Sequence, residues 1–144
     1  MKINKPKYWD KKKIGLLPIL FFPLTLITLL IIFLKKVFCT AKSFNIPVIC
    51  VGNIYIGGTG KTPTSIFLAN KLSELGFKPA IVRKFYSSHV DEHGLIKQNF
   101  NNLILKKNRE LGIKEAVKDG HDLAILDDGL QDYKVKKNVK IVCF

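Results

Sequence analysis

The chain of 144 residues is poor in acidic residues and in cysteine. Eleven Asp and Glu stand against 24 Lys and Arg, and the resulting net charge of +13 favours an anionic partner such as nucleic acid or a membrane surface. The three cysteines have no CxxC spacing, so neither a disulfide framework nor a zinc site is expected. Internal repeats and low-complexity linkers are absent, and an apolar content of 47% excludes a disordered chain.

The basic excess is concentrated at the N-terminus, and this position favours a membrane over nucleic acid. Residues 1–42 hold nine Lys against one Asp (+8), whereas residues 43–144 hold fifteen Lys and Arg against ten acids (+5). Residues 14–34 carry no charge, and a helix of that length would be about 30 Å long, enough to span a bilayer. A helix buried in a soluble core and a cleaved signal peptide are the alternatives. We expect residues 1–42 to form a membrane anchor.

The lysines around this apolar run also predict its orientation. Lys and Arg are more numerous before the run than after it, which places the N-terminus on the cytoplasmic side. A complete span would then put residues 43–144 outside the cytoplasm, although the glycine-rich segment at 52–62 is typical of a nucleotide site and nucleotides are cytoplasmic. Because Pro18 and Pro23 favour a kink, we expect the segment to enter one leaflet of the membrane and lie in it rather than cross it, with the lysines on both sides near anionic headgroups.

A glycine-rich segment lies between a predicted buried strand, residues 46–51, and a predicted helix, residues 63–75. A strand, a glycine loop and a helix in this order can form a phosphate site, since loop amides and the helix N-terminus attract phosphate oxygens. Lys61 would reach the β- and γ-phosphates and Thr62 would bind Mg²⁺. The expected ATP-binding residues are Tyr55, Ile56, Gly57, Gly58, Thr59, Gly60, Lys61 and Thr62.

The loop departs from the strict pattern G-x-x-x-x-G-K-[ST], because Tyr55 stands where the first glycine is required. A glycine-rich turn that binds nothing is therefore an alternative. Partition-type ATPases are another, although their loop has a Lys where this chain has Ile56.

The rest of the chain predicts an α/β fold with a P-loop NTPase-like parallel sheet and flanking helices. Asn108 is a candidate N-cap for one of these helices. The fourth strand ends in Asp127 and Asp128, at the edge of such a sheet where ligands bind, and we expect both to serve Mg²⁺. Two solvated aspartates in a turn are the alternative. The further predicted elements are strands at 78–82, 103–105, 122–126 and 139–144, a polar loop at 83–94 and a helix at 108–118.

These motifs together resemble the tetraacyldisaccharide 4'-kinase family, the lipid A kinases of Gram-negative bacteria. The resemblance rests on an apolar N-terminal segment followed by the sequences VGN at 51–53, GGTGKTP at 57–63 and DDGLQ at 127–131. It implies transfer of the ATP γ-phosphate to the 4'-hydroxyl of a tetraacyldisaccharide 1-phosphate, at the cytoplasmic face of the inner membrane. The implied partners are this lipid A precursor and membrane lipids, with no nucleic acid, and the implied cofactors are ATP and Mg²⁺.

The resemblance also implies a catalytic carboxylate in an Asp-Glu pair after the second strand. Asp91 is the residue at that position, and it would orient or deprotonate the sugar hydroxyl, with Lys61 on the transferring phosphate. The chain departs from the family at Val90 and His93, which stand where Gly and Pro are usual, and at Asp132, which stands for His. His89, His93 and His121 have no metal-ligand spacing and are expected at the surface.

The expected organisation is an anchor at 1–42 and a kinase domain at 43–144 that lacks the C-terminal lobe of the family, so that the chain would be a fragment. Two other functions stay open: a membrane-attached P-loop ATPase or GTPase without a lipid acceptor, and a truncated member of the family that transfers nothing.

Overall fold

The computed structural model describes residues 16–54, 60–86 and 90–144, without the side chains of residues 17, 18 and 90–92. The chain divides into two compact units, Met1–Thr40 and Ala41–Phe144, which are described separately.

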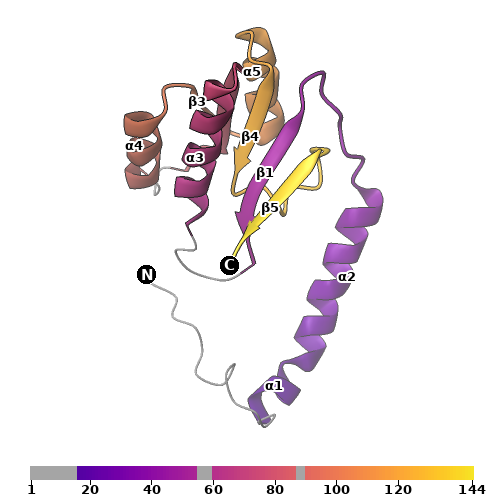
Figure 1. Cartoon of the computed structure of the whole chain (residues 1–144). Helices are drawn as coiled ribbons and strands as arrows, with labels where there is room; N and C mark the ends of the chain where they lie inside the picture. The colour runs from indigo at the N-terminus through magenta and orange to yellow at the C-terminus, as the bar shows by residue number, and fades with distance from the viewer. Residues whose placement is uncertain (1–15, 55–59, 87–89) are drawn as a thin grey trace. The chain divides into compact units, whose positions relative to one another are not determined.

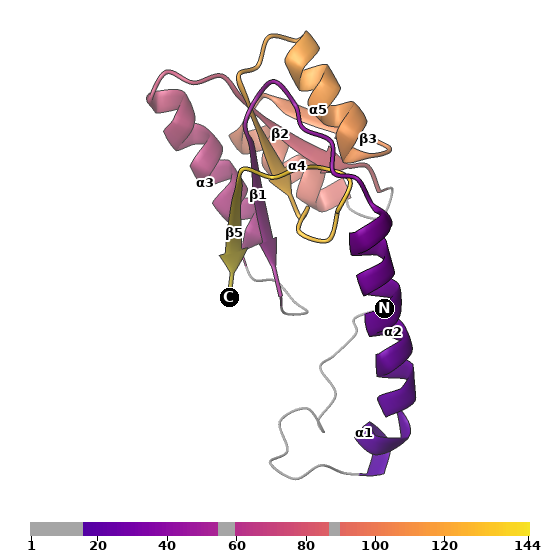
Figure 2. The same ribbon diagram turned by 90° about the vertical axis from the view of Figure 1, so that its right-hand side faces the viewer.

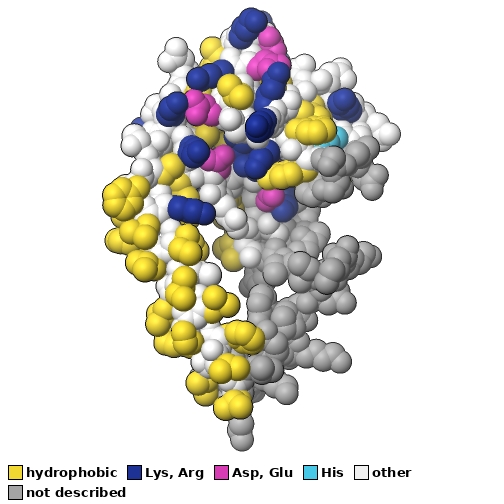
Figure 3. Space-filling model, turned by 180° about the vertical axis from the view of Figure 1, so that it is seen from behind, with side chains coloured by type: hydrophobic (Ala, Val, Ile, Leu, Met, Phe, Trp, Pro, Cys, Tyr) yellow, Lys and Arg dark blue, Asp and Glu magenta, His cyan; other side chains and the backbone are white. Residues whose placement is uncertain are grey.

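The described part of the first unit consists of two helices, α1 (Leu16–Leu20) and α2 (Phe22–Phe38). The helices are separated at Phe21, and Pro23 lies in the first turn of α2, where its missing N–H breaks no helical hydrogen bond. None of the α2 side chains is buried, and its Leu, Ile and Phe side chains lie on the surface (Figure 3). Within residues 16–54, 60–86 and 90–144, no helix has both the length and the apolar character needed to cross a membrane.

The second unit is built on a five-stranded parallel sheet in the order β3-β2-β4-β1-β5 (Figures 1 and 2). The α/β prediction is thus confirmed, and the five predicted strands lie within two residues of their expected limits. The strands are β1 (Val48–Asn53), β2 (Pro79–Lys84), β3 (Leu103–Lys106), β4 (Leu123–Asp127) and β5 (Val139–Cys143).

The helices of this unit cover both faces of the sheet. On one face lie α3 (Lys61–Glu74) and α4 (Val90–Asn99), and on the other lies α5 (Arg109–Lys118) (Figure 2). The predicted cap of α5 is confirmed, because the Asn108 side chain accepts a hydrogen bond of 2.9 Å from the Leu111 amide. The predicted polar loop at 83–94 is wrong: β2 continues through Lys84, and α4 begins at Val90.

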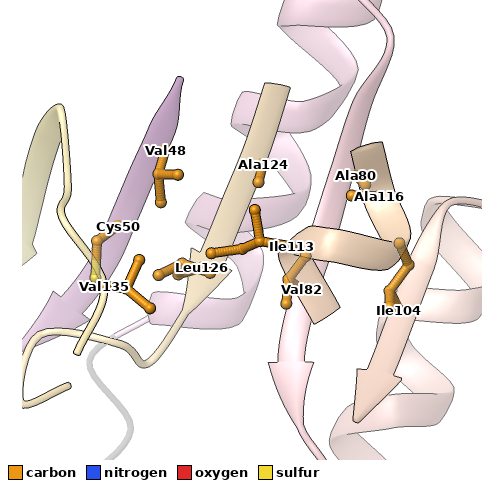
Figure 4. Close-up of a cluster of buried hydrophobic side chains, with 10 residues drawn as sticks. All are labelled: Val48, Cys50, Ala80, Val82, Ile104, Ile113, Ala116, Ala124, Leu126 and Val135. Carbon is orange, nitrogen blue, oxygen red and sulfur yellow. The ribbon is translucent and has the colours of Figure 1, made fainter. Parts of the chain in front are cut away.

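Residues along the central strands alternate between the two faces, as the pleat requires. Ile81 and Ile125 pack towards α3 and α4, whereas Val82 and Leu126 pack towards α5. Figure 4 shows the α5 side, where Ile113 lies among the side chains of the central strands. Since both faces are covered, the central strands are apolar except at their carboxyl ends, and β4 is fully buried.

Candidate functional site

The candidate site lies at the edge of the sheet where the parallel strands have their carboxyl ends. Lys61 and Thr62 form the first turn of α3, directly after Gly60, whose φ of 75° lies in the left-handed region that favours glycine. The phosphate-loop residues Tyr55, Ile56, Gly57, Gly58 and Thr59 lie outside the described residues. The described end of the predicted loop therefore leads straight into a helix N-terminus, which attracts anions.

Asp127, the last residue of β4, is fully buried and holds the centre of a polar cluster. Its Oδ2 accepts a hydrogen bond of 3.1 Å from the Thr62 hydroxyl, and its Oδ1 accepts one of 3.2 Å from the Ser65 hydroxyl. The Arg83 guanidinium lies 3.1 Å from Oδ2 and forms an ion pair with it. Asp127 is thus not one of two solvated aspartates in a turn.

Asp128 follows the strand in a different setting. Its φ of 61° is left-handed, which is uncommon for a residue other than glycine. The side chain is half exposed, and its Oδ1 accepts a hydrogen bond of 2.9 Å from the Lys61 ammonium group. Its amide donates to the Val51 carbonyl at 2.9 Å, and Arg109 donates to its carbonyl oxygen. Asp128 is therefore fixed through both its backbone and its carboxylate.

The turn after Asp128 is held by two cations. Arg109 contacts the Asp132 carboxylate at 3.5 Å, and Lys137 donates to the carbonyl oxygens of Leu130 and Asp132. Burial, as the largest effect, lowers the pKa of Lys137 from its usual value. Arg109 thus binds the carboxylate of Asp132, and Lys137 binds its main-chain carbonyl.

Close packing at this edge depends on small residues under the turn. A Cβ atom added to Gly52, which precedes the phosphate loop, would lie 2.5 Å from the Leu130 side chain. Gly129 packs in a similar way against Leu126 and the Cys50 sulfur. Burial raises the pKa of the Cys50 thiol, which makes this cysteine a packing residue rather than a nucleophile.

Asp91, the predicted catalytic carboxylate, lies in the first turn of α4, and its side chain is outside the described residues. The next described side chain of this helix, His93, is 7% exposed and stacks on Phe85 with ring centroids 5.9 Å apart. The expectation that His93 lies at the surface is therefore wrong. His121 is partly exposed, and its Nδ1 lies 3.1 Å from the Lys78 carbonyl oxygen. His89 lies outside the described residues.

The structure thus brings together four predicted residues, Lys61, Thr62, Asp127 and Asp128. Each carboxylate faces a cation, Arg83 for Asp127 and Lys61 for Asp128. A hydroxyl and two carboxylates are the oxygen ligands that Mg²⁺ prefers, so these residues fit that ion. No group of three or more His, Cys, Asp and Glu that could hold a metal ion is found among the described residues.

Sequence reasoning missed Ser65, Arg83 and Arg109. Ser65 lies three residues after Thr62 on a helix, and this spacing alone would have put the two hydroxyls on one face. The sequence predicts a loop at Arg83, and its proximity to Asp127 depends on the adjacency of β2 and β4, which local sequence patterns do not reveal. Arg109 reaches Asp128 because α5 begins at the same edge of the sheet.

Comparison with known proteins places this arrangement in a family. Residues 14–144 match the family model described as LpxK: Tetraacyldisaccharide-1-P 4'-kinase. A tetraacyldisaccharide 4'-kinase of Pelagibacter ubique is 41% identical over all of the chain and 45% of its own length. One of Rickettsia bellii is 33% identical over 99% of the chain and 48% of its own length.

A solved structure is similar in fold. The crystal structure of the "apo" form of LpxK from Aquifex aeolicus in complex with ATP aligns with a TM-score of 0.72 and 24% identity, over 88% of this chain and 49% of that one. The chain spans about half the length of these relatives. Because the family model covers nearly all of the sequence, the chain belongs to the tetraacyldisaccharide-1-P 4'-kinase family.

Proposed function

We propose that this chain is part of an ATP-dependent kinase that phosphorylates the 4'-hydroxyl of tetraacyldisaccharide 1-phosphate in lipid A biosynthesis. The observation that carries the proposal is the convergence of Lys61 and Thr62 at a helix N-terminus with Asp127 and Asp128 at the end of β4. The family membership supports the same reaction, since the relatives are named for it.

The proposed roles follow from the chemistry of each group. Phosphoryl transfer requires positioning and neutralisation of charge more than covalent help from the protein. Residues 55–62 would hold the ATP phosphates, with Lys61 on the transferring group. Thr62, Asp127 and Asp128 would hold Mg²⁺, which neutralises phosphate charge when it is bound. Asp91 would orient or deprotonate the acceptor hydroxyl.

We also propose that residues 1–42 attach the kinase domain, residues 43–144, to the cytoplasmic face of the inner membrane of a Gram-negative bacterium. The exposed apolar side chains of α1 and α2 and the lysines around them support this attachment. The acceptor carries four acyl chains, and each CH₂ group moved into water costs about 0.8 kcal/mol. An anchored enzyme meets this acceptor without extracting it from the bilayer.

The test is transfer of labelled γ-phosphate from ATP to tetraacyldisaccharide 1-phosphate in detergent micelles. We would compare this chain, the complete reading frame that encodes it, Lys61→Ala and the control Lys71→Ala. Lys71 belongs to the same helix but pairs with Glu74, in the last turn of α3. We expect phosphate transfer, and we expect Lys61→Ala to abolish it and Lys71→Ala to preserve it. Nucleotide hydrolysis unaffected by the acceptor, without transfer, would contradict the lipid kinase.

A further inference from the structure

A buried arginine stands beside the buried carboxylate of the candidate site. The side chains of Arg83 and Asp127 are 6% and 1% exposed, and they lie 3.1 Å apart. β2 and β4 are adjacent and parallel, and Val82 is in register with Leu126, so the next residue of each strand is Arg83 and Asp127. Two neighbouring parallel strands thus end with opposite charges on the face covered by α3.

The contacts of Asp127 give Arg83 a defined task. Oδ2 faces both the Thr62 hydroxyl and the Arg83 guanidinium, and Oδ1 accepts from Ser65. A carboxylate buried without a cation is costly, and a rigid, permanently charged guanidinium offsets this cost in one geometry. The hydroxyls alone leave the carboxylate's charge uncompensated.

We propose that Arg83 is a positioning residue, which holds the Asp127 carboxylate, and through it Thr62, in the orientation that receives the metal–nucleotide complex. Arg83 acts through Asp127 and does not itself touch the nucleotide. This inference rests on the proposed function, because it assumes that Asp127 and Thr62 serve Mg²⁺. Groups that orient a metal ligand in this way typically change metal affinity by about 10- to 100-fold when they are removed.

The experiment measures the affinity of a fluorescent ATP analogue in Mg²⁺ and in EDTA, using the complete reading frame that encodes this chain. The readout is the gain in affinity that Mg²⁺ produces. We expect Arg83→Met to reduce this gain by on the order of tenfold or more and to leave the affinity in EDTA unchanged. Arg83→Lys, which keeps the charge but loses the planar fork, should fall between Arg83→Met and the wild type.

Two further variants separate positioning from a merely structural role. Lys84 is the next residue of β2, and its ammonium group lies over the Tyr86 ring. Lys84→Met removes this charge and should keep the full gain in nucleotide affinity that Mg²⁺ produces. In an Asp127→Asn background, Arg83→Met should cause little further loss, because its effect passes through Asp127. If Arg83→Met does not fold, Arg83→Lys replaces it in both comparisons, once in the wild type and once in the Asp127→Asn background.

The outcomes are distinct. Equal losses in Mg²⁺ and in EDTA, or an Arg83 effect that persists in Asp127→Asn, would overturn the inference and leave the proposed function intact. A wild-type protein that binds the analogue equally well in Mg²⁺ and in EDTA would overturn both.

Discussion

At the scale of single residues, Lys61 has two possible partners. In this structure it pairs with Asp128 at 2.9 Å, and in the proposed function it binds phosphate. The Asp128 side chain is 51% exposed, and pairs of this kind contribute about 0.2 to 1 kcal/mol. A nucleotide phosphate can therefore displace Asp128 at small cost, which would release that carboxylate for the metal as the nucleotide arrives.

This exchange predicts that Lys61 weakens metal binding when no nucleotide is present. We expect Lys61→Met to raise the affinity of the nucleotide-free protein for Mn²⁺ by up to about fivefold, while it weakens binding of Mg-ATP. Titration followed by electron paramagnetic resonance measures free Mn²⁺ directly. Lys71→Met, which breaks the pair with Glu74 at the other end of α3, should leave Mn²⁺ affinity unchanged. An unaltered Mn²⁺ affinity in Lys61→Met would show that the two partners do not compete.

Glu110 gives the fold a dependence on acid pH. Hydrogen bonds from Lys42 and Lys114 lower the pKa of this carboxyl below its usual value. A lowered pKa in the folded state means that the stabilisation is complete above the ordinary Glu pKa and is lost as the pH falls through the lower, folded-state value.

Wild type should therefore melt at a higher temperature than Glu110→Gln near neutral pH, and the difference should shrink as the pH falls below about 4.3. Thermal melts of both proteins over that range provide the measurement. Glu74→Gln, which removes an exposed carboxylate from α3, controls for the general loss of negative charge. A difference between wild type and Glu110→Gln that stays constant down to the acid limit would contradict the role of these hydrogen bonds.

At the scale of elements, the sequence predicts what depends on local pattern. Apolar runs of four to six residues mark the buried strands, and Asn108 marks the start of α5, because strand burial and helix capping are local effects. Helix α4 was missed because Gly94 and two neighbouring acids interrupt its apolar pattern. The pairing of Arg83 with Asp127 could not be foreseen, since it depends on the order of the strands in the sheet.

Replacement of glycine by alanine should have opposite effects on the free energy of unfolding at two glycines within helices. A Cβ atom on Gly112 of α5 would lie 2.4 Å from Val82 Cγ1 on β2, whereas no atom of the described residues lies within 4 Å of a Cβ on Gly94 of α4. We expect Gly112→Ala to lower the free energy of unfolding by about 1 to 3 kcal/mol, because overpacking outweighs the gain in helix propensity. Gly94→Ala should raise it by about 0.5 to 1 kcal/mol. Urea unfolding of both variants and the wild type measures these free energies. Stabilisation by Gly112→Ala would contradict the prediction and show that α5 can shift away from the sheet.

At the scale of the whole molecule, the two proposed functions, membrane attachment and phosphoryl transfer, belong to different units. The second unit, Ala41–Phe144, is called the sheet unit here, and it contains the candidate site. In the first unit, no side chain of α2 is buried. The main-chain contacts of Lys42 lie within the sheet unit, because its amide donates to the Lys134 carbonyl and its carbonyl accepts from the Lys136 amide, both at 2.9 Å. Removal of residues 1–40 therefore breaks none of these contacts.

We accordingly predict that a chain beginning at Ala41 keeps its far-ultraviolet circular dichroism and melting temperature but no longer co-sediments with vesicles that contain anionic lipid. Replacement of Lys11, Lys12 and Lys13 by Gln should weaken vesicle binding on the order of a hundredfold at low salt, since each juxtamembrane Lys contributes about 1 kcal/mol. Added salt should reduce this difference, because it screens the charges but not the apolar contact. Vesicle binding by the chain that begins at Ala41, equal to that of the whole chain, would instead assign membrane attachment to the sheet unit.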